Sequence, residues 1–385
     1  MLRTIAIANY RSLRRVVVPL HGLDVVTGAN GTGKSSLYRA LRLLADCARG
    51  RVVASLAREG GMSSTMWAGP EKLSQEMRSG EHPVQGTRRS TSVNVQMGFA
   101  GDDFGYLIDL GLPLPGESLF DLDPQIKREA IWSGPVLRPG TWLADRRNEM
   151  VRVRGGDGEW QHLAQGIRPF ESMLSELTDP QRAPELLTVR EQVRSWRFYD
   201  HFRTDADAPA RQSQLATRTP VLADDGSDLA SALQTIREVG NGDALHETID
   251  NAFPGATLRI DHTAGRLDLA FGQPGLLRPL TSAELSDGTL RYLLWAAALL
   301  TPRPPELMVL NEPETSLHPD LLPALGRLIV KAAESTQIVV VSHSQALVEE
   351  MGATATTVEL VKDLGETRIA GQEPFDGPSW NWGSR

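Results

Sequence analysis

The stretch "GANGTGKS" (residues 28–35) combines three glycines with a lysine and a serine at fixed spacing. It satisfies the pattern G-x-x-x-x-G-K-[ST], which forms a phosphate-binding loop between a strand and a helix. Both neighbours are present. "LDVVTG" (23–28) is apolar like a central strand, and "SSLYRALRLLADCARG" (35–50) has helical spacing and closes on a glycine. The sequence therefore predicts an α/β fold organised around this loop.

The residue types of the loop suit a chain of phosphates. The glycines let the backbone curl so that successive N–H groups point inward, and the following helix adds its positive end. Lys34 places a charge on the β- and γ-phosphates, and Ser35 offers a hydroxyl to Mg²⁺. We expect a nucleoside triphosphate, although kinases, GTPases and many ATPases share this loop. The candidate binding residues are Gly28, Asn30, Gly31, Gly33, Lys34, Ser35 and Ser36.

The bulk composition limits the classes of protein that fit. The chain has 385 residues, is 41% hydrophobic and carries a net charge of −8, which argues against a general polyanion binder. Cys47 is the single cysteine, so an intrachain disulfide is excluded and a reducing compartment is expected. The N-terminus lacks the apolar core of a signal peptide, and the longest apolar run, 292–300, is too short to span a membrane. We expect a cytoplasmic protein that does not enter the membrane.

The periodicity of apolar residues divides the chain into three parts. Alternating runs at 2–10, 14–20 and 104–112, and a hairpin at 149–163, predict a mixed sheet. Helical spacing follows, with "PELLTVREQVRSWRFYDHF" (184–202) as its longest run. Near the C-terminal end, a strand–helix–strand order predicts parallel pairing in one sheet. We predict an N-terminal lobe with the phosphate loop, a helical lobe and a C-terminal lobe, at 1–165, 166–255 and 256–385.

Three further motifs follow the phosphate loop in a fixed order. "LSDGT" (285–289) places a serine and a glycine at the start of an apolar helix, which resembles another anion cradle. "LMVLNE" (307–312) is an apolar strand that ends in an acid, and the next apolar strand ends in "VSHS" (341–344). Parallel strands bring these groups to one edge of the sheet, where ligands bind in open α/β folds. The order of motifs is similar to that of ABC-type ATPases.

Two more stretches resemble the RecF/SMC/OLD branch of that family most closely. Within this branch, the resemblance is greatest to the stand-alone predicted ATPases. "IANYRSL" (7–13) resembles the opening strand of the branch, and "NEPETSLHP" (311–319) resembles its acidic strand end. The motifs cover both ends of the chain, whereas residues 60–280 carry no nucleotide motif. The resemblance implies a P-loop ABC-type ATPase head with a mixed-sheet lobe, a helical lobe and no long coiled coil.

The same resemblance implies a role for each motif residue. Glu312 would be the general base for water and His343 would contact the γ-phosphate. Ser286 and Gly288 would close over the nucleotide that a partner subunit holds. We therefore expect a homodimer, assembled head to tail around two ATP molecules, with ATP and Mg²⁺ as cofactors and slow hydrolysis.

Asn311 departs from the family pattern, which has a metal-linked aspartate at this position. Asparagine keeps a carbonyl oxygen but loses the charge, and Mg²⁺ prefers charged oxygen ligands while keeping several waters. We expect Ser35 and Asn311 to bind the metal more weakly, without a complete loss of metal binding. Glu314 could compensate, or it could be a solvated loop residue. His318 is not expected to bind a metal, since no second His or Cys lies at ligand spacing.

Several assignments stay open from the sequence. Arg11 is a candidate contact near the nucleotide or an exposed arginine at a strand end. The glutamine that links Mg²⁺ to the helical lobe in ABC proteins has three candidates, Gln96, Gln161 and Gln165. Basic clusters could form a strip that follows the phosphates of DNA, or they could be solvated or paired within the chain. These clusters are residues 11–15, 145–154 and 194–203.

The motif order favours one function among three. In the ATP-binding subunit of a membrane transporter, the signature motif follows the phosphate loop much more closely than the roughly 250 residues found here. A non-hydrolysing scaffold that uses ATP only to hold a dimer together is the main alternative, and Asn311 supports it. We expect an ATPase that serves DNA repair, chromosome maintenance or phage defence. An effector, if there is one, is expected to be a separate chain.

Overall fold

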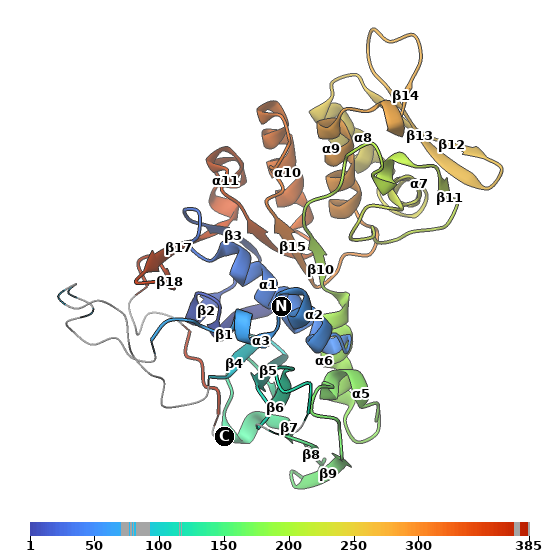
Figure 1. The fold of residues 1–385 in the computed structure, drawn as a ribbon. Helices are drawn as coiled ribbons and strands as arrows, with labels where there is room; N and C mark the ends of the chain where they lie inside the picture. The colour runs from blue at the N-terminus through green and yellow to red at the C-terminus, as the bar shows by residue number, and fades with distance from the viewer. Residues whose placement is uncertain are drawn as a thin grey trace. The chain divides into compact units, whose positions relative to one another are not determined.

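The computed structural model divides the chain into two compact units (Figure 1). The first consists of Met1–His21, Val26–Trp196 and Val358–Arg385, and the second of Gly22–Val25 and Arg197–Thr357. The three predicted lobes remain a prediction, because units of contact do not delimit functional lobes. The composition of residues 59–90 also predicts an irregular segment, and much of it falls outside the described residues. The structure describes residues 1–70, 77, 79, 81, 93–114, 116, 118–372 and 378–383.

An eight-stranded sheet forms much of the first unit. Its strands are β1 (Leu2–Tyr10), β2 (Leu13–Pro19), β4 (Val95–Gly101), β5 (Phe104–Gly111), β6 (Gln125–Ser133), β7 (Trp142–Arg147), β8 (Met150–Arg154) and β9 (Trp160–Gln165). They lie in the order β2-β1-β4-β5-β6-β7-β8-β9, and all neighbours are antiparallel. β1 and β5 are buried at nearly every residue, whereas β9 at the edge is not. The predicted strands at 2–10, 14–20 and 104–112 and the hairpin at 149–163 are confirmed.

Helix α1 (Lys34–Ala48) packs against this sheet and against shorter helices. Leu37, Leu41 and Leu44 recur at helical spacing and are buried, which explains why the sequence predicts the helix. A C-terminal hairpin of β17 (Thr356–Asp363) and β18 (Glu366–Ile369) brings β18 beside β2. The other helices described in this unit are α2 (Val52–Arg58), α3 (Met62–Thr65), α5 (Met173–Glu176) and α6 (Pro184–Ser195).

A parallel sheet forms the centre of the second unit. β15 (Leu307–Asn311) pairs in parallel with β10 (Arg197–Tyr199) on one side and with β16 (Gln337–Val341) on the other. Beside β16 the chain enters β3 (Leu23–Thr27), where the N–H of Ile338 donates to the carbonyl oxygen of Gly22 at 2.8 Å. The predicted parallel pairing of the two C-terminal strands is confirmed.

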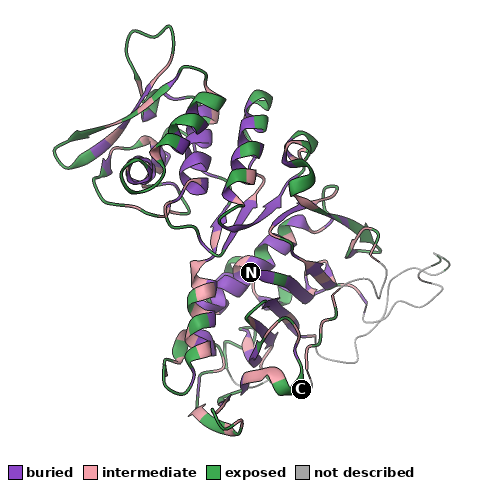
Figure 2. Ribbon diagram, turned by 180° about the vertical axis from the view of Figure 1, so that it is seen from behind, coloured by how far each residue is buried: buried purple, intermediate pink, exposed green. Residues whose placement is uncertain are grey.

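Helices pack with this sheet to make the core of the second unit. Every residue of α9 (Asp287–Leu299) from Thr289 onward is buried (Figure 2). A helix that is apolar on all sides is expected to be buried on all sides, which accounts for the run "YLLWAAALL". The other helices of this unit are α7 (Leu229–Val239), α8 (Gly242–Ala252), α10 (Leu322–Ala332) and α11 (Gln345–Met351).

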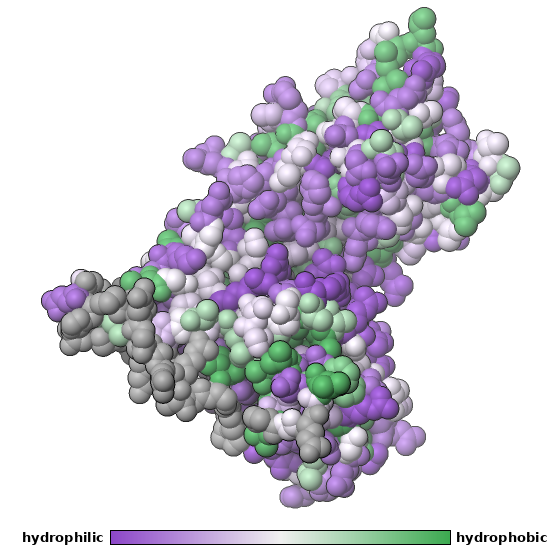
Figure 3. All heavy atoms as spheres, viewed as in Figure 1, coloured by the Kyte–Doolittle hydropathy of each residue, from purple (hydrophilic) through white to green (hydrophobic). Residues whose placement is uncertain are grey.

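A small antiparallel sheet projects from the helices of the second unit (Figure 1). It contains β11 (Gln214–Leu215), β12 (Thr257–Thr263), β13 (Arg266–Gly272) and β14 (Leu280–Thr281). Apolar residues gather at the tip of the loop that joins β13 to β14 (Figure 3), where Leu277 is fully exposed. The alternating sequence of residues 256–271 also predicts a hairpin, which the pairing of β12 with β13 confirms.

The prediction of a helix through 184–202 is wrong at its C-terminal end. Helix α6 ends at Ser195, and Arg197–Tyr199 form the strand β10 instead. Phe198 and Tyr199 are buried, and pairing with a strand more than 100 residues away outweighs the local helical spacing. The same pairing places the end of β10 next to the end of β15.

Helix lengths bear on two further expectations. α1, with 15 residues, is the longest helix in the described part of the chain, so no long coiled coil occurs there. Among the same residues, none of the helices combines the length and apolar character needed to cross a bilayer.

Candidate functional site

The phosphate loop leads from the end of β3 into α1. Gly28 and Gly33 have φ angles of 138° and 110°, which residues with a side chain rarely adopt. A Cβ atom at Gly28 would collide with the carbonyl oxygen of Leu360, and one at Gly33 with the hydroxyl of Thr367. Glycine is therefore required at these two positions both by the backbone and by close neighbours.

Lys34 lies at the first turn of α1 and is almost fully buried. Its ammonium group donates to the carbonyl oxygens of Gly28 at 2.6 Å and Ala29 at 3.1 Å. The first turn of α1 has no acidic residue, so nothing there neutralises the positive end of the helix. Backbone N–H groups, a cation and hydroxyls at a helix start are the groups that bind phosphate. The remaining predicted loop residues are exposed or half-buried: Asn30, Gly31, Ser35 and Ser36.

The C-terminal hairpin contacts the phosphate loop through Thr367. Thr367 is fully buried, and its Oγ1 lies 2.6 Å from the carbonyl oxygen of Thr32 and 2.8 Å from the hydroxyl of Ser12. A carbonyl oxygen only accepts, so Thr367 donates to the loop and accepts from Ser12. The backbone N–H of Thr367 also donates to Ser12 at 2.8 Å. Sequence motifs gave no signal for Thr367, although Ser12 lies within the quoted "IANYRSL".

In the second unit, the carboxyl ends of two parallel strands carry the acidic and histidine motifs. Asn311 is in register with Val341, and the N–H of Glu312 donates to the carbonyl oxygen of Val341 at 2.7 Å. His343 follows two residues later. The structure therefore places Glu312 and His343 at the same edge of one sheet, as the strand–helix–strand pattern predicts.

Glu312 adopts an unusual backbone conformation. Its φ is 48°, in the left-handed region, which costs a residue with a side chain about 1–2 kcal/mol. Strained residues of this kind persist where the surrounding structure fixes them, and they cluster at active sites. The turn after β15 therefore holds the Glu312 side chain in a direction that an extended strand would not give it.

Glu314 organises the turn that carries His343. Its Oε1 accepts from the hydroxyl of Ser342 at 2.7 Å and from the N–H groups of His343 and Ser344 at 2.9 and 3.2 Å. The same oxygen lies 3.2 Å from Nδ1 of His343. Glu314 is 7% exposed, so the interpretation as a solvated loop residue is wrong. Its bonds go to the end of β16 and fix the backbone on both sides of His343.

Asn311 is paired with an acid that lies in none of the sequence motifs. Its Nδ2 donates to Oδ1 of Asp200 at 2.7 Å, and Asp200 follows β10 directly. The carbonyl oxygen Oδ1 of Asn311 is buried and has no hydrogen-bond partner among the described residues. The end of β15 thus presents an oriented amide with a free oxygen.

The signature motif forms the start of α9. Ser286 is the N-cap, and its Oγ accepts from the N–H of Thr289 at 3.2 Å. Ser286 is exposed and Gly288 is half-buried. A Cβ at Gly288 would lie 3.7 Å from the carbonyl oxygen of Ser316, in the loop that follows Glu312. The signature turn and the acidic loop are therefore neighbours within the second unit.

Two arginines, the half-buried Arg211 and the buried Arg291, connect the signature turn to its surroundings. Arg211 donates to the carbonyl oxygen of Leu285 at 2.8 Å and to the carboxylate of Asp287 at 2.7 Å. Arg291 on α9 donates to the carbonyl oxygens of Thr315 at 2.7 Å and Phe202 at 3.0 Å. Burial lowers the pKa of Arg291 from its ordinary value. Neither arginine lies in a recognised motif, so only the fold identifies them.

A model of the protein family described as "AAA domain, putative AbiEii toxin, Type IV TA system" matches residues 25–349. The chain belongs to this family. The match begins in β3 and ends in α11, so it includes the phosphate loop, the signature motif, the acidic strand end and His343. No match was found among the curated proteins.

Solved structures place this AAA family member in the SMC-head fold. An SMC head bound to the C-terminal winged-helix domain of ScpA is 13% identical, with a TM-score of 0.51 and coverage of 96% of both chains. The SMC head domain from Thermotoga maritima is 14% identical, with a TM-score of 0.45, and covers 97% of this chain and 99% of its own. The first match shows that the chain has the fold of an SMC head, with the α/β architecture that the motifs predict.

Other residues singled out from the sequence have partners within the chain. Arg11 donates to the carboxylate of Glu59 at 2.6 Å, and Gln96 donates to Asp109 at 2.9 Å. Gln161 and Gln165 lie on the edge strand β9, so the choice of the metal-linked glutamine stays open. His318 caps the short 3-10 helix Pro319–Leu321, with its Nδ1 accepting from the N–H of Asp320.

The three basic clusters contain several arginines and an aspartate that are bonded within the chain. Arg146 is fully buried and donates to Glu129 at 2.7 Å, and Asp145 accepts from Arg152 at 2.8 Å. In the other two clusters, Arg14 pairs with Glu366 and Arg203 with Asp205. Pairing reduces the charge available to a polyanion, which favours the interpretation of these clusters as solvated or paired surfaces.

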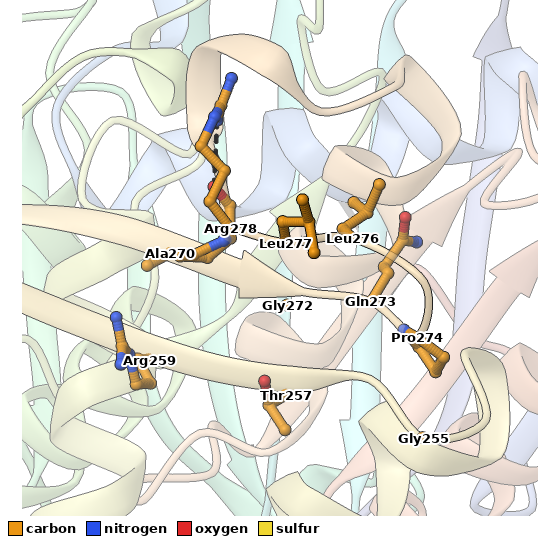
Figure 4. Close-up of a pocket in the computed structure, with 11 residues that line it drawn as sticks. Gly255, Thr257, Arg259, Ala270, Gly272, Gln273, Pro274, Leu276, Leu277 and Arg278 are labelled. Atoms are coloured by element: carbon orange, nitrogen blue, oxygen red, sulfur yellow. Dashed lines mark hydrogen bonds between the residues drawn. The ribbon is translucent and has the colours of Figure 1, made fainter.

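A surface pocket of about 310 Å³ lies between β12, β13 and the loop that joins β13 to β14 (Figure 4). Leu276, Leu277 and Pro274 line it, and Arg278 donates to the carbonyl oxygen of Pro279 at 3.1 Å. No residue of the nucleotide motifs lines this pocket. The candidate site therefore consists of the motif residues and the residues that form hydrogen bonds with them.

Thr367→Val is expected to loosen the phosphate loop. Valine keeps the shape of threonine but removes the hydrogen bond to Thr32, which costs about 1 kcal/mol and lowers affinity for an ATP analogue several-fold. Thermal unfolding and fluorescence titration with the analogue measure the two effects. Thr356→Val, at the half-buried start of β17, is the matched control. Equal affinities for Thr367→Val and wild type would contradict a supporting role for the hairpin.

Proposed function

We propose that this chain binds ATP with Mg²⁺ and hydrolyses it slowly. The observation that carries the proposal is the register of β15 and β16, which sets Glu312 and His343 at one edge of a parallel sheet. The strand beside β16 is β3. The phosphate loop begins at Gly28, directly after β3 and three residues after Val25. A phosphate cradle and a base for water are the parts that triphosphate hydrolysis needs.

Each side chain has a proposed role in this reaction. Lys34 and the loop N–H groups hold the β- and γ-phosphates and stabilise the charge that develops on them. The carboxylate of Glu312 orients the attacking water and accepts its proton. His343, held by Glu314 at its backbone, contacts the γ-phosphate through its imidazole.

Mg²⁺ would neutralise phosphate charge when it is bound, and the donor set fits it. Mg²⁺ is usually held by one or two protein oxygens together with substrate phosphates and water, not by a protein cage. The exposed hydroxyl of Ser35 and the free carbonyl oxygen of Asn311 are two such oxygens. The described residues contain no group of three or more His, Cys, Asp or Glu arranged to hold a metal, which is consistent with this mode of binding.

We also propose a homodimer that closes head to tail around two ATP molecules. Ser286 and the adjacent N–H groups lie at the N-terminus of α9, where a helix attracts phosphate, and Ser286 is exposed to a partner. In this arrangement the signature turn of one subunit contacts the γ-phosphate held by the other. The lobes 1–165, 166–255 and 256–385 would supply the phosphate loop, the helical part and the remaining motifs.

Measuring the mass of the protein in solution, with and without ATP–Mg²⁺, tests the dimer. Wild type is expected to shift towards a dimer with ATP, and Ser286→Arg is expected to remain a monomer, because its long side chain fills the place of the partner's γ-phosphate. Asp287→Arg is less suitable as a control because Asp287 binds Arg211, so Asn251→Arg at an exposed position of α8 serves instead. A wild-type monomer under every condition would contradict the head-to-tail dimer.

The biological task is proposed from the family. The family description names an AAA domain and a Type IV toxin–antitoxin system. We propose that ATP hydrolysis serves DNA repair, chromosome maintenance or phage defence. We propose a cytoplasmic location and a separate effector chain. DNA remains a proposed partner, tested by salt-dependent binding with and without ATP.

A non-hydrolysing scaffold is the second candidate function. Asn311 favours it, because the missing charge weakens metal binding. A scaffold would form ATP-dependent dimers without releasing phosphate. Phosphate release by wild type that is absent from Glu312→Gln would exclude this function.

A further inference from the structure

We propose that Asp200 supplies the charge that the metal site lacks at Asn311, so that the two side chains act as one unit. The proposal rests on the proposed binding of ATP–Mg²⁺. In the family pattern, one aspartate at the end of β15 combines the oxygen and the negative charge. Here the oxygen is on Asn311 and the charge is on the neighbouring strand.

The parallel register of β10 and β15 brings the two side chains together. Tyr199 is opposite Leu310, so Asp200 and Asn311 are the next residues along each strand. Their side chains meet through the 2.7 Å bond from Nδ2 of Asn311 to Oδ1 of Asp200. Both residues therefore lie at the edge that also carries Glu312.

The chemistry of the pair fixes the direction of the asparagine amide. A carboxylate only accepts hydrogen bonds, so the NH₂ group of Asn311 must face Asp200 and its carbonyl oxygen must face away. That oxygen is buried and unpartnered among the described residues. Bonding to a carboxylate also polarises the amide, which makes the carbonyl oxygen a better metal ligand.

Glu314, the compensating acid considered from the sequence, is not bonded to Asn311. Its Oε1 accepts from Ser342, His343 and Ser344 at the end of β16, and its Oε2 is buried without a hydrogen-bond partner among the described residues. Asp200 is exposed, and its bond to Asn311 leaves the other oxygen for water. Asp200 is the acid that is bonded directly to the candidate ligand, and we assign it as a positioning residue.

A charge swap tests the pairing with two separate binding measurements. The affinity for a fluorescent ATP analogue is measured in EDTA, and the affinity for Mn²⁺ is measured on the nucleotide-loaded protein by electron paramagnetic resonance. Asp200→Asn is expected to weaken Mn²⁺ binding roughly 10- to 100-fold, as loss of an outer partner of a metal ligand does, without changing nucleotide affinity in EDTA. Asp207→Asn removes the same charge at an exposed position seven residues away and is the control.

The double variant Asp200→Asn, Asn311→Asp reverses the polarity of the bond and restores a carboxylate. It is expected to bind Mn²⁺ nearly as tightly as wild type. The inference is overturned if Asp200→Asn binds Mn²⁺ like wild type or like Asp207→Asn, or if the double variant is no better than Asp200→Asn. A wild-type protein that binds no nucleotide in EDTA or with metal would overturn the proposed function itself. Normal nucleotide binding with an unaffected Asp200→Asn would overturn only the role of Asp200.

Discussion

Glu312→Gln is expected to lower the rate of ATP hydrolysis by a factor on the order of 10²–10⁴, the usual contribution of a general base. Glutamine has nearly the same shape but cannot accept the proton of the attacking water. The turn after β15 should survive, because the N–H of residue 312 would still donate to Val341. Phosphate release under steady-state conditions measures the rate, and the affinity for the ATP analogue is expected to stay near the wild-type value.

The strained backbone at Glu312 provides a control for this result. Glutamine keeps the unfavourable φ of 48°, whereas Glu312→Gly removes it and is expected to stabilise the fold by about 1 kcal/mol. Both variants should lose hydrolysis, although only Glu312→Gly should unfold at a higher temperature. Hydrolysis by either variant at the wild-type rate would show that another group activates the water.

The sequence predicts the phosphate loop well because its determinants are local. Gly28, Gly33 and Lys34 lie within seven consecutive residues, and the strand before them and the helix after them have clear apolar patterns. The parallel strands that carry Glu312 and His343 are equally clear, because both are short, buried and separated by one helix. The order of the motifs along the chain therefore predicts both the fold and the positions of the principal candidates.

The residues that form hydrogen bonds with the motif residues could not be predicted, because they lie far from those motifs in the sequence. Asp200 is 111 residues from Asn311, and Thr367 is 335 residues from Thr32. Asp200 follows a segment whose spacing is helical, and no local pattern indicates that Arg197–Tyr199 form a strand. Glu314 shows the same limit, since its burial depends on bonds to the end of β16 and not on its own neighbours.

Lys34→Ala is expected to weaken nucleotide binding by a factor on the order of 100 or more. A hydrogen bond to a charged group is worth about 1.5–3 kcal/mol, and each 1.4 kcal/mol changes affinity tenfold. The ammonium of Lys34 is almost fully buried beside the loop carbonyls and is not paired with any carboxylate among the described residues, so its charge is available to phosphate. Fluorescence titration with the ATP analogue measures the loss.

The matched control is Lys331→Ala, which removes one lysine that is exposed and paired with Glu247 in the second unit. Its nucleotide affinity should equal that of wild type. Lys34 also donates to Gly28 and Ala29, so its removal could loosen the loop as well as remove charge. Lys34→Met separates the two causes, because it keeps the length of the side chain without the ammonium group. If Lys34→Ala and Lys34→Met both bind the analogue as tightly as wild type, the loop is not the phosphate site, whatever the outcome at Glu312.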